Sequence, residues 1–509
     1  MNRKYRYKQT TRGNEVYRSE ATINVRRWLA RGVNLKSGIA VLLVSAICLP
    51  ALAAEKTCQD DLECKSAWLA ASDGERKEIF KFSEEYKLFM DVARTELSFV
   101  SEAITLAEAA GFRRLKTNSP MKPGAKYYDV NRDRAISVMI IGDEGLSAGM
   151  RVVGAHIDSP RLELKGRPLF SANEFALFQT NYHGGIKRYQ WTNIPLALVG
   201  IVDKKDGSRV EVNIGLQPDD PILMIPDMSP HVDRGYNDKK VGELVTYESL
   251  DPIVAHLPTA EEGLGIEDQV LMMLKSRYGV TRADLVSAEL SLVPAYAPRD
   301  MGLDRSMVAA YGQDDKLGAY AALRAVLASK TPTHTALAYL VDNEEVGNVN
   351  NTGAQSDYFS NLVARMLNAE MGKSYRDIEV RKALRNSKMI SIDVNPGVNP
   401  MRASAWELNN APKLGYGVNF KMYGRGFTAN SEFTAEIRRI LDDAGVPWQT
   451  ATYKVGRSGG GTIGGEFSRQ DMEVIDFGVP VLSIHTPYAV SSKIDIYNLY
   501  RGSKAFFEN

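Results

Sequence analysis

The spacing of apolar residues predicts alternating helices and strands over the body of the chain. Apolar residues repeat near helical spacing over 82–110, and Gly111 follows as a helix stop, which predicts one helix. Residues 135–141 form a short apolar run between turn residues, which is typical of a strand, whereas residues 317–328 return to helical spacing. This alternation predicts an α/β fold with a largely parallel sheet flanked by helices.

The pattern changes in the middle of the chain. Residues 196–202 and 209–214 form short runs that are typical of antiparallel strands, and Asp206-Gly207 between them predicts a hairpin turn. A stretch near 259–290 again has helical character. We therefore predict that a β-rich domain interrupts the α/β domain.

The N-terminus has the pattern of an export signal. Residues 1–36 carry ten Lys and Arg against two Glu, and the sixteen residues 38–53 that follow are uncharged. Sixteen residues are short for a membrane-spanning helix, which needs about 20. The run ends in small residues, which predicts a signal peptide, 1–53, cleaved near Ala53 or Ala54. The protein is then exported, periplasmic or extracellular, without a stable membrane anchor; an uncleaved anchor or a buried helix is the alternative.

Domain boundaries follow from these changes of pattern. The predicted order is a signal peptide over 1–53, a first part of the catalytic domain over 54–165, an inserted β-rich domain over 166–301 and a second catalytic part over 302–509. No repeat or low-complexity linker separates them.

Composition and charge exclude several classes of protein. With 44% hydrophobic and 25% charged residues, the chain has a globular composition rather than a disordered, fibrous or multi-span membrane one. Without residues 1–53 the chain holds 53 basic and 60 acidic residues, a net charge of −7, which gives no general reason to bind nucleic acid. Cys58 and Cys64 then remain near the new terminus, either as a local disulfide or as two free thiols.

Side chains that can bind metal ions follow four apolar runs. The runs and the residues after them are 152–155 with His156 and Asp158, 336–341 with Glu344 and Glu345, 389–392 with Asp393, and 479–484 with His485. Asp314 and Asp315 lie just before the helix predicted over 317–328. Because the carboxyl ends of parallel strands meet at one edge of a sheet, we expect these groups to converge. The other histidines do not fall at predicted strand ends: they are His183, His231, His256 and His334.

The types of these residues favour a site for two metal ions. Two imidazoles and several carboxylates, without cysteine, suit zinc first, with cobalt or manganese as alternatives. Crowded carboxylates would hold protons unless cations supply positive charge. Two divalent ions about 3.5–4 Å apart can polarise a carbonyl group, as in aminopeptidases. Each feature alone has an ordinary structural explanation, so the prediction depends on their coincidence.

Eight short motifs occur in a specific order from about residue 75 onwards. They lie at 110–112, 123–128, 155–162, 314–317, 342–347, 391–393, 461–464 and 483–485. In these motifs the chain closely resembles the M18 metallopeptidases, the aspartyl aminopeptidase family. The resemblance implies a zinc-peptidase-like catalytic domain, and a chance match of this extent is implausible.

The resemblance implies a ligand set for two ions. His156 and Asp393 would bind one ion, and Glu345 and His485 would bind the other. Asp314 would bridge both ions.

Further roles are implied by the same resemblance. Asp158 would orient His156, and Glu344 would be the general base. Asp315 would be a helix cap or a supporting group rather than the bridge. His231 would reach a neighbouring subunit's active site and help hold the substrate carbonyl oxygen. Residues 182–185 resemble the family's Gly-rich turn.

These inferences predict an exported dinuclear aminopeptidase that hydrolyses the N-terminal peptide bond of peptides. The resemblance implies a homo-oligomer, dimer-based and up to a dodecamer, with the inserted domain at dimer contacts. One alternative is a related two-metal amidohydrolase or dipeptidase of the M20, M28 or M42 kind, and another is an inactive metal-binding scaffold. Residues 394–400 hold no histidine, unlike many relatives, which leaves the preferred amino-terminal residue open.

Overall fold

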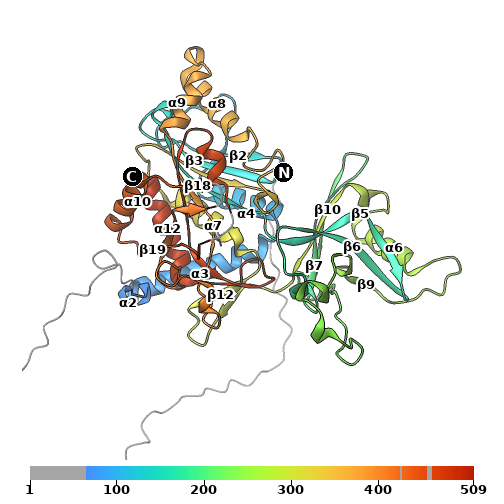
Figure 1. The fold of residues 1–509 in the computed structure, drawn as a ribbon. Coiled ribbons are helices and arrows are strands. Elements are labelled where there is room, and N and C mark those ends of the chain that lie inside the picture. Colours follow the sequence, from blue (N-terminus) through green and yellow to red (C-terminus); the bar gives the residue numbers. More distant parts are fainter. Residues whose placement is uncertain (1–64, 425–426, 456–460) are drawn as a thin grey trace, which may run out of the picture. The chain divides into compact units, whose positions relative to one another are not determined.

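The computed structural model describes residues 65–424, 427–455 and 461–509 (Figure 1). The predicted signal peptide, its cleavage region at Ala53 and Ala54, and the residues Cys58 and Cys64 lie outside the described residues. Within the described part of the chain, no helix is both long and apolar enough to cross a lipid bilayer.

A nine-stranded mixed sheet supports the predicted site. Its strands, in spatial order, are β1 (Arg113–Arg114), β2 (Lys126–Asn131), β3 (Ala135–Ile140), β13 (Thr335–Val341), β4 (Met150–His156), β14 (Lys388–Ile392), β20 (Glu473–Gly478), β16 (Val418–Lys421) and β19 (Trp448–Thr450). The four central strands β13, β4, β14 and β20 are parallel, whereas β3 and β16 run antiparallel to their central neighbours. The fold is therefore mixed α/β, with a parallel centre and antiparallel pairs on both sides.

Helices cover both faces of this sheet. Ala336, Ala338 and Leu340 of β13 pack in one core with α3 (Asp73–Val92), α4 (Glu96–Ala109), α7 (Gln313–Ala328), α10 (Ser431–Asp443) and α12 (Lys493–Glu508). The intervening Leu337, Tyr339 and Val341 pack in another core with α8 (Tyr358–Met371), α9 (Ile378–Asn386) and α11 (Gly464–Ser468). Side chains alternate across a strand, so one buried strand contributes to two cores and has a continuous apolar sequence.

The prediction of one helix over 82–110 is wrong, because two helices, α3 and α4, occupy this region. The Thr95 Oγ1 atom accepts a hydrogen bond from the Ser98 backbone N–H, and the Ser98 Oγ atom accepts one from the Thr95 N–H. This reciprocal capping box starts a new helix. Apolar spacing continues across the break because both helices pack on the same core, where the Phe89 and Phe99 rings lie 5.0 Å apart.

A second sheet has six strands, all antiparallel. In spatial order they are β8 (Arg209–Ile214), β7 (Leu196–Asp203), β10 (Ala288–Pro294), β5 (Arg161–Ala172), β6 (Phe175–His183) and β9 (Ile253–Ala255) (Figure 1). This sheet has a hydrophobic core of its own, which includes residues of α6 (Ile266–Tyr278). The predicted hairpin is confirmed, because β7 pairs with β8 and Gly207 takes a positive φ of 83° in the turn. The helix predicted near 259–290 is shorter, since β10 begins at Ala288.

A third sheet contains five short strands. They are β11 (Arg299–Met301), β12 (Met307–Ala310), β22 (Ala489–Ser492), β21 (Pro480–Leu482) and β15 (Asn395–Pro396). The remaining short elements include β17 (Tyr423–Gly424), β18 (Phe427–Thr428), α2 (Ala67–Ala70) and α5 (Val241–Leu244).

The expectation that all four apolar runs end at one edge of a parallel sheet fails for the run 479–484. The fourth parallel strand is β20, which ends at Gly478, and β21 belongs to the third sheet. A Cβ atom on Gly478 would lie 1.9 Å from the carbonyl oxygen of Asp393, so the two strand ends approach closely only because position 478 has no side chain. The chain then leaves the central sheet before it reaches His485.

Candidate active site

Predicted site residues lie at the ends of three neighbouring parallel strands, at one edge of the central sheet. His156 is the last residue of β4, Asp393 directly follows β14, and Glu344 and Glu345 lie in the turn after β13. Val341 of β13 lies in register with His156. The predicted convergence of these strand ends is therefore present in the structure.

Asp314 lies between the two predicted imidazole ligands. One of its carboxylate oxygens, Oδ1, is 3.2 Å from His156 Nε2, and the other, Oδ2, is 3.1 Å from His485 Nε2. Asp314 comes from the start of α7 and His485 from the turn after β21, so these groups are separated widely in the sequence. A carboxylate with an imidazole nitrogen at each oxygen has the geometry of a bridging ligand.

Two further carboxylates lie beside this trio. Glu345 Oε1 is 3.4 Å from His485 Nε2, and Asp393 Oδ1 is 4.0 Å from His156 Nε2. Potential ligand atoms of His156, Asp314 and Glu345 all lie within 4.8 Å of one another. The structure thus brings all five predicted ligands together.

Asp158 contacts this group and holds parts of it in place. Its side chain is fully buried, and its Oδ1 atom lies 3.2 Å from His156 Nδ1. The same carboxylate accepts hydrogen bonds from the backbone N–H groups of Glu344 and Glu345, each at 3.1 Å. Asp158 therefore orients one imidazole and fixes the turn that carries both glutamates.

The charges of the site shift the pKa values of its carboxyl groups in opposite directions. Burial, and then the charge of Asp314, raise the pKa of Glu345 to about 8 and that of Asp393 well above its ordinary value. Burial would also raise the pKa of Asp314, but its hydrogen bonds with His156 and His485 hold that pKa below its ordinary value. These carboxyl groups cannot all be ionised without more positive charge nearby.

The histidines show the same need for charge compensation. Burial alone would lower the pKa of His485, but Asp314 and Glu345 raise it to about 9. Burial opposes protonation of His156 as well, yet its bonds to Asp158 and Asp314 raise its pKa well above the ordinary value. Cations bound at the Nε2 atoms would replace these protons.

The donor set fits divalent ions of the zinc type. It consists of imidazole nitrogens and carboxylate oxygens without thiolates, which suits zinc, cobalt or manganese. The Glu345 Oε1 atom is buried and has no hydrogen-bond partner among the described residues. An unpartnered buried carboxylate oxygen that faces an imidazole is the kind of atom that an ion would satisfy.

The start of α7 explains how adjacent aspartates take different positions. Asp314 and Asp315 have non-helical backbone angles, so the regular helix begins at Lys316. Asp315 Oδ1 accepts the backbone N–H of Gly318 at 3.2 Å, which is the bond of an N-terminal helix cap. Asp315 therefore supports the helix, while Asp314 faces the imidazoles.

Two charged residues of the site have no role in the sequence-based prediction. His183, at the end of β6, places its Nε2 atom 2.8 Å from Asp158 Oδ2, so the prediction that it lies away from strand ends is wrong. Burial would lower the pKa of His183, but its bonds to Asp158 and Glu163 raise it to about 9. Lys421, buried on β16, lowers the pKa of Asp393 through its charge. The only sequence signal for His183 is its place in the Gly-rich turn at 182–185, which assigns no role to its imidazole, and the spacing of residues along the chain gives no signal for Lys421.

His231 is not part of this group of residues. The structure places it on an exposed turn, where its backbone N–H donates to Ser229 Oγ at 3.3 Å. Within the described residues, the hydrogen bonds and ion pairs of the active-site group do not include His231. Any role in catalysis would have to be played in another subunit.

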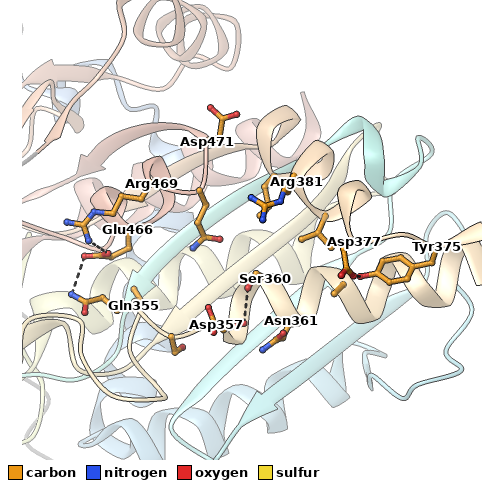
Figure 2. Close-up of a pocket in the computed structure, with 16 residues that line it drawn as sticks. Gln355, Asp357, Ser360, Asn361, Tyr375, Asp377, Arg381, Glu466, Arg469 and Asp471 are labelled. Atoms are coloured by element: carbon orange, nitrogen blue, oxygen red, sulfur yellow. Dashed lines mark hydrogen bonds and ion pairs between the residues drawn. The ribbon is translucent and has the colours of Figure 1, made fainter.

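Two hollows on the surface differ in their relation to the site. A cavity of about 1040 Å³ borders His485 and is lined by residues that include Gly185, Arg188, Trp406 and Leu482. A second hollow, of about 740 Å³, lies over α8, α9 and α11 (Figure 2) and contains none of the predicted site residues.

The charged side chains of the second hollow are largely paired with their neighbours. Arg469 lies 2.7 Å from Glu466, and Gln355 donates to Glu466 at 3.4 Å (Figure 2). The Tyr375 hydroxyl donates to Asp377 at 3.0 Å. No histidine is among the described residues that line this hollow, so it does not gather imidazoles and carboxylates as the site around Asp314 does.

Comparison with known proteins agrees with the site. A family model described as aminopeptidase I zinc metalloprotease (M18) matches residues 89–507. A probable M18 family aminopeptidase 1 of Clostridium acetobutylicum is 39% identical over 460 residues, which cover 88% of this chain and 98% of the relative. The chain belongs to the M18 family. It is a metallo-aminopeptidase, a hydrolase, by this membership.

Solved M18 structures share the fold. The M18 aminopeptidase of Thermotoga maritima superimposes with a TM-score of 0.82 at 38% identity, and the alignment covers 88% of this chain and 99% of that one. The yeast mApe1 dodecamer has a TM-score of 0.70 at 21% identity over 84% and 96% of the two chains, which shows a common fold alone. Membership of a zinc metalloprotease family implies that the M18 chain described here depends on metal.

The two adjacent aspartates give a direct test of the bridge. We expect Asp314→Ala to abolish retention of both ions, because both imidazoles lose the carboxylate between them. Asp315→Asn keeps an acceptor for the Gly318 N–H and should retain ions within about tenfold of the wild-type affinity. Elemental analysis after dialysis measures the ion content of each variant. Retention by Asp314→Ala together with loss in Asp315→Asn would move the bridge to position 315.

Proposed function

We propose that the chain is an exported, dinuclear aminopeptidase that hydrolyses the N-terminal peptide bond of peptides. The observation that carries this proposal is the position of Asp314, which has one imidazole at each carboxylate oxygen, at 3.2 Å and 3.1 Å. One bridging carboxylate with a separate histidine on each side favours two ions over one.

The other ligands divide between the two sides. Beyond Asp314, Asp393 Oδ1 is 4.0 Å from His156 Nε2 and Glu345 Oε1 is 3.4 Å from His485 Nε2, so each ion would have one histidine and one further carboxylate. Zinc is the first choice for these donors, with cobalt or manganese as alternatives. When bound, the ions would polarise the scissile carbonyl and activate water for attack.

Glu344 is suited to move the proton in this reaction. Its side chain is 15% exposed, and its Oε2 atom is 3.9 Å from His156 Nε2. Burial raises its pKa, which makes a carboxylate a better base near neutral pH. Glu344 would take a proton from the attacking water and pass it to the leaving amine. Glu345, next to it, is nearer to His485 and serves as a ligand.

The cavity beside His485 has a size and a lining that suit a peptide substrate. It adjoins the ligand group directly, and its walls combine apolar surface from Leu482 and Trp406 with the polar groups of Asn399 and Arg402. A large open cavity can accept an extended chain beyond its first residue.

A Glu344→Gln variant tests the assignment of the base. We expect it to keep its ions and to lose about 10²–10⁴-fold in kcat, because the amide cannot accept the proton. Turnover of a panel of amino-acid anilides, with and without chelator, measures the effect. Acylated amino acids and dipeptides in the same panel distinguish an aminopeptidase from a related amidohydrolase, and an inactive wild-type protein would indicate a scaffold. Wild-type rates in Glu344→Gln would assign the base elsewhere.

We propose further that the protein is a homo-oligomer in which His231 acts in a neighbouring subunit's active site. Apolar side chains on both sides of His231 are exposed in the single chain: Met228 is 56% exposed, Val232 is 69% and Val241 is 62%. Such exposure at one region is typical of a surface that another subunit covers. The yeast relative solved as a dodecamer is an example of such assembly on this fold.

Mixed oligomers test this role of His231. We expect His231→Ala and Glu344→Gln each to be nearly inactive alone. Co-expressed in one oligomer, they should recover up to about a quarter of the wild-type activity, because some sites then combine an intact Glu344 with a partner's intact histidine. Oligomers of Glu344→Gln alone are the control for background activity. Mixed oligomers with no recovery would contradict a role across subunits.

We also propose that the protein is exported. The first 53 residues support export, because a basic stretch is followed by a short, uncharged apolar run that ends in small residues. We expect mature protein in a periplasmic or extracellular fraction to begin at Ala54 or Glu55. N-terminal sequencing of the purified protein measures this, and an intact Met1 on exported protein would contradict cleavage.

A further inference from the structure

Three consecutive residues connect the second sheet to the active site. His183 is the last residue of β6, and its neighbour across the strand pair is Arg161 of β5. Gly184 and Gly185 follow directly. We call residues 183–185 the connecting segment.

The first residue of the connecting segment holds Asp158. His183 Nε2 lies 2.8 Å from Asp158 Oδ2, while Glu163 Oε1 lies 3.3 Å from His183 Nδ1. Glu163 in turn pairs with Arg161 at 2.9 Å. Both ring nitrogens therefore have a carboxylate partner, and the ring cannot turn without breaking both contacts. Through Asp158, this ring fixes the orientation of His156.

The last residue of the segment holds the other imidazole. The carbonyl oxygen of Gly185 lies 2.7 Å from His485 Nδ1. A bond at Nδ1 fixes which ring nitrogen carries the proton and leaves Nε2 directed at Asp314, 3.1 Å away. His485 is 38% exposed, so this backbone bond is an important restraint on its ring.

The middle residue of the segment packs on a third ligand. Gly184 has a positive φ of 73°, and a Cβ atom there would lie 2.8 Å from Glu345 Oε2. The absence of a side chain lets the backbone lie directly against the Glu345 carboxylate. The three residues thus contact, directly or through Asp158, both histidines and one glutamate of the ligand set.

We infer that the connecting segment is a positioning element for the metal centre, through which the second sheet sets the orientation of both imidazole ligands and of Glu345. This inference rests on the proposed function, because it assigns to that site the residues that hold its ligands in place. It predicts that ion affinity depends on residues of the second sheet that touch no ion. It also makes His183 a positioning residue rather than a catalytic one.

Replacement of His183 tests the first contact. His183→Leu removes the donor to Asp158, and we expect the affinity for zinc to fall by about 10–100-fold. His183→Gln keeps an N–H donor at similar reach and should restore affinity to within about threefold of wild type. Tyr182→Leu is the control. Tyr182 lies next to His183 on β6, but its ring stacks on that of Tyr247, with the ring centroids 5.1 Å apart. Competition with a chromogenic chelator measures zinc affinity in the full-length protein.

Two glycine variants test the segment without changing a charge. Gly184→Ala should displace Glu345 and weaken the zinc ion on the His485 side. Gly207→Ala, in the β7–β8 turn, is the control: its φ of 83° is also positive, but an added Cβ atom meets nothing within 4 Å, so it should bind zinc as wild type does. The visible spectrum of the cobalt-loaded protein reports ligand geometry independently of activity. We expect it to change in Gly184→Ala and His183→Leu, and to stay unchanged in Gly207→Ala and Tyr182→Leu.

The outcomes separate this inference from the proposed function. Wild-type protein that binds no zinc or cobalt would overturn both. Wild-type protein that binds two ions, with the same affinity and cobalt spectrum in His183→Leu and Gly184→Ala, would overturn the inference alone. If His183→Leu does not fold, the pair Gly184→Ala and Gly207→Ala still decides it, because both keep every charged group and both replace a glycine with positive φ.

Discussion

Electrostatic repulsion among buried carboxylates is the constraint on which the active site depends. Five carboxyl groups and two imidazoles share one small region, namely Asp158, Asp314, Glu344, Glu345, Asp393, His156 and His485. Two like charges about 4 Å apart repel by about 4 kcal/mol at an effective dielectric constant of about 20. Several such pairs would cost a large part of the stability of an ordinary domain. Burial, and then the charge of Asp314, raise the pKa of Glu345 to about 8, and further positive charge nearby would favour its ionised form.

The fold brings the carboxylates and imidazoles of the site together and places the neighbouring Glu344 and Glu345 differently. Parallel neighbours β4, β13 and β14 place His156, the two glutamates and Asp393 at one sheet edge, where a site is common in α/β folds. Asp158, which accepts bonds from the turn after β13, fixes Glu344 and Glu345 in different directions. One glutamate can then act on protons while its neighbour remains a ligand. The second sheet completes the arrangement through the segment that follows β6.

Sequence patterns predicted the site better than they predicted the elements around it. His156, Asp314, Glu345, Asp393 and His485 could be chosen because each follows an apolar run or precedes a helix, and the structure brings all five together. The family also could be recognised from ordered motifs, and the match over residues 89–507 confirms it. The roles of the individual residues, the number of ions, the domain boundaries and export remain predictions.

The incorrect predictions have physical causes that the order of residues along the chain does not reveal. The break between α3 and α4 leaves apolar spacing intact, because Phe89 and Phe99 pack together across it. The run 479–484 directly follows β20, yet its strand β21 pairs in the third sheet, and only the folded chain shows that pairing. His183 contacts Asp158 because β6 pairs with β5, and no spacing in the sequence encodes that pairing.

Anomalous diffraction at the zinc absorption edge, from crystals of the protein purified without chelator, would locate bound zinc ions. We expect two peaks for each chain, one on each side of the Asp314 carboxylate, with His156 and Asp393 at the first and Glu345 and His485 at the second. No peak after zinc addition, or peaks only at places away from Asp314, would contradict the claim that bound cations compensate the charge of this pocket.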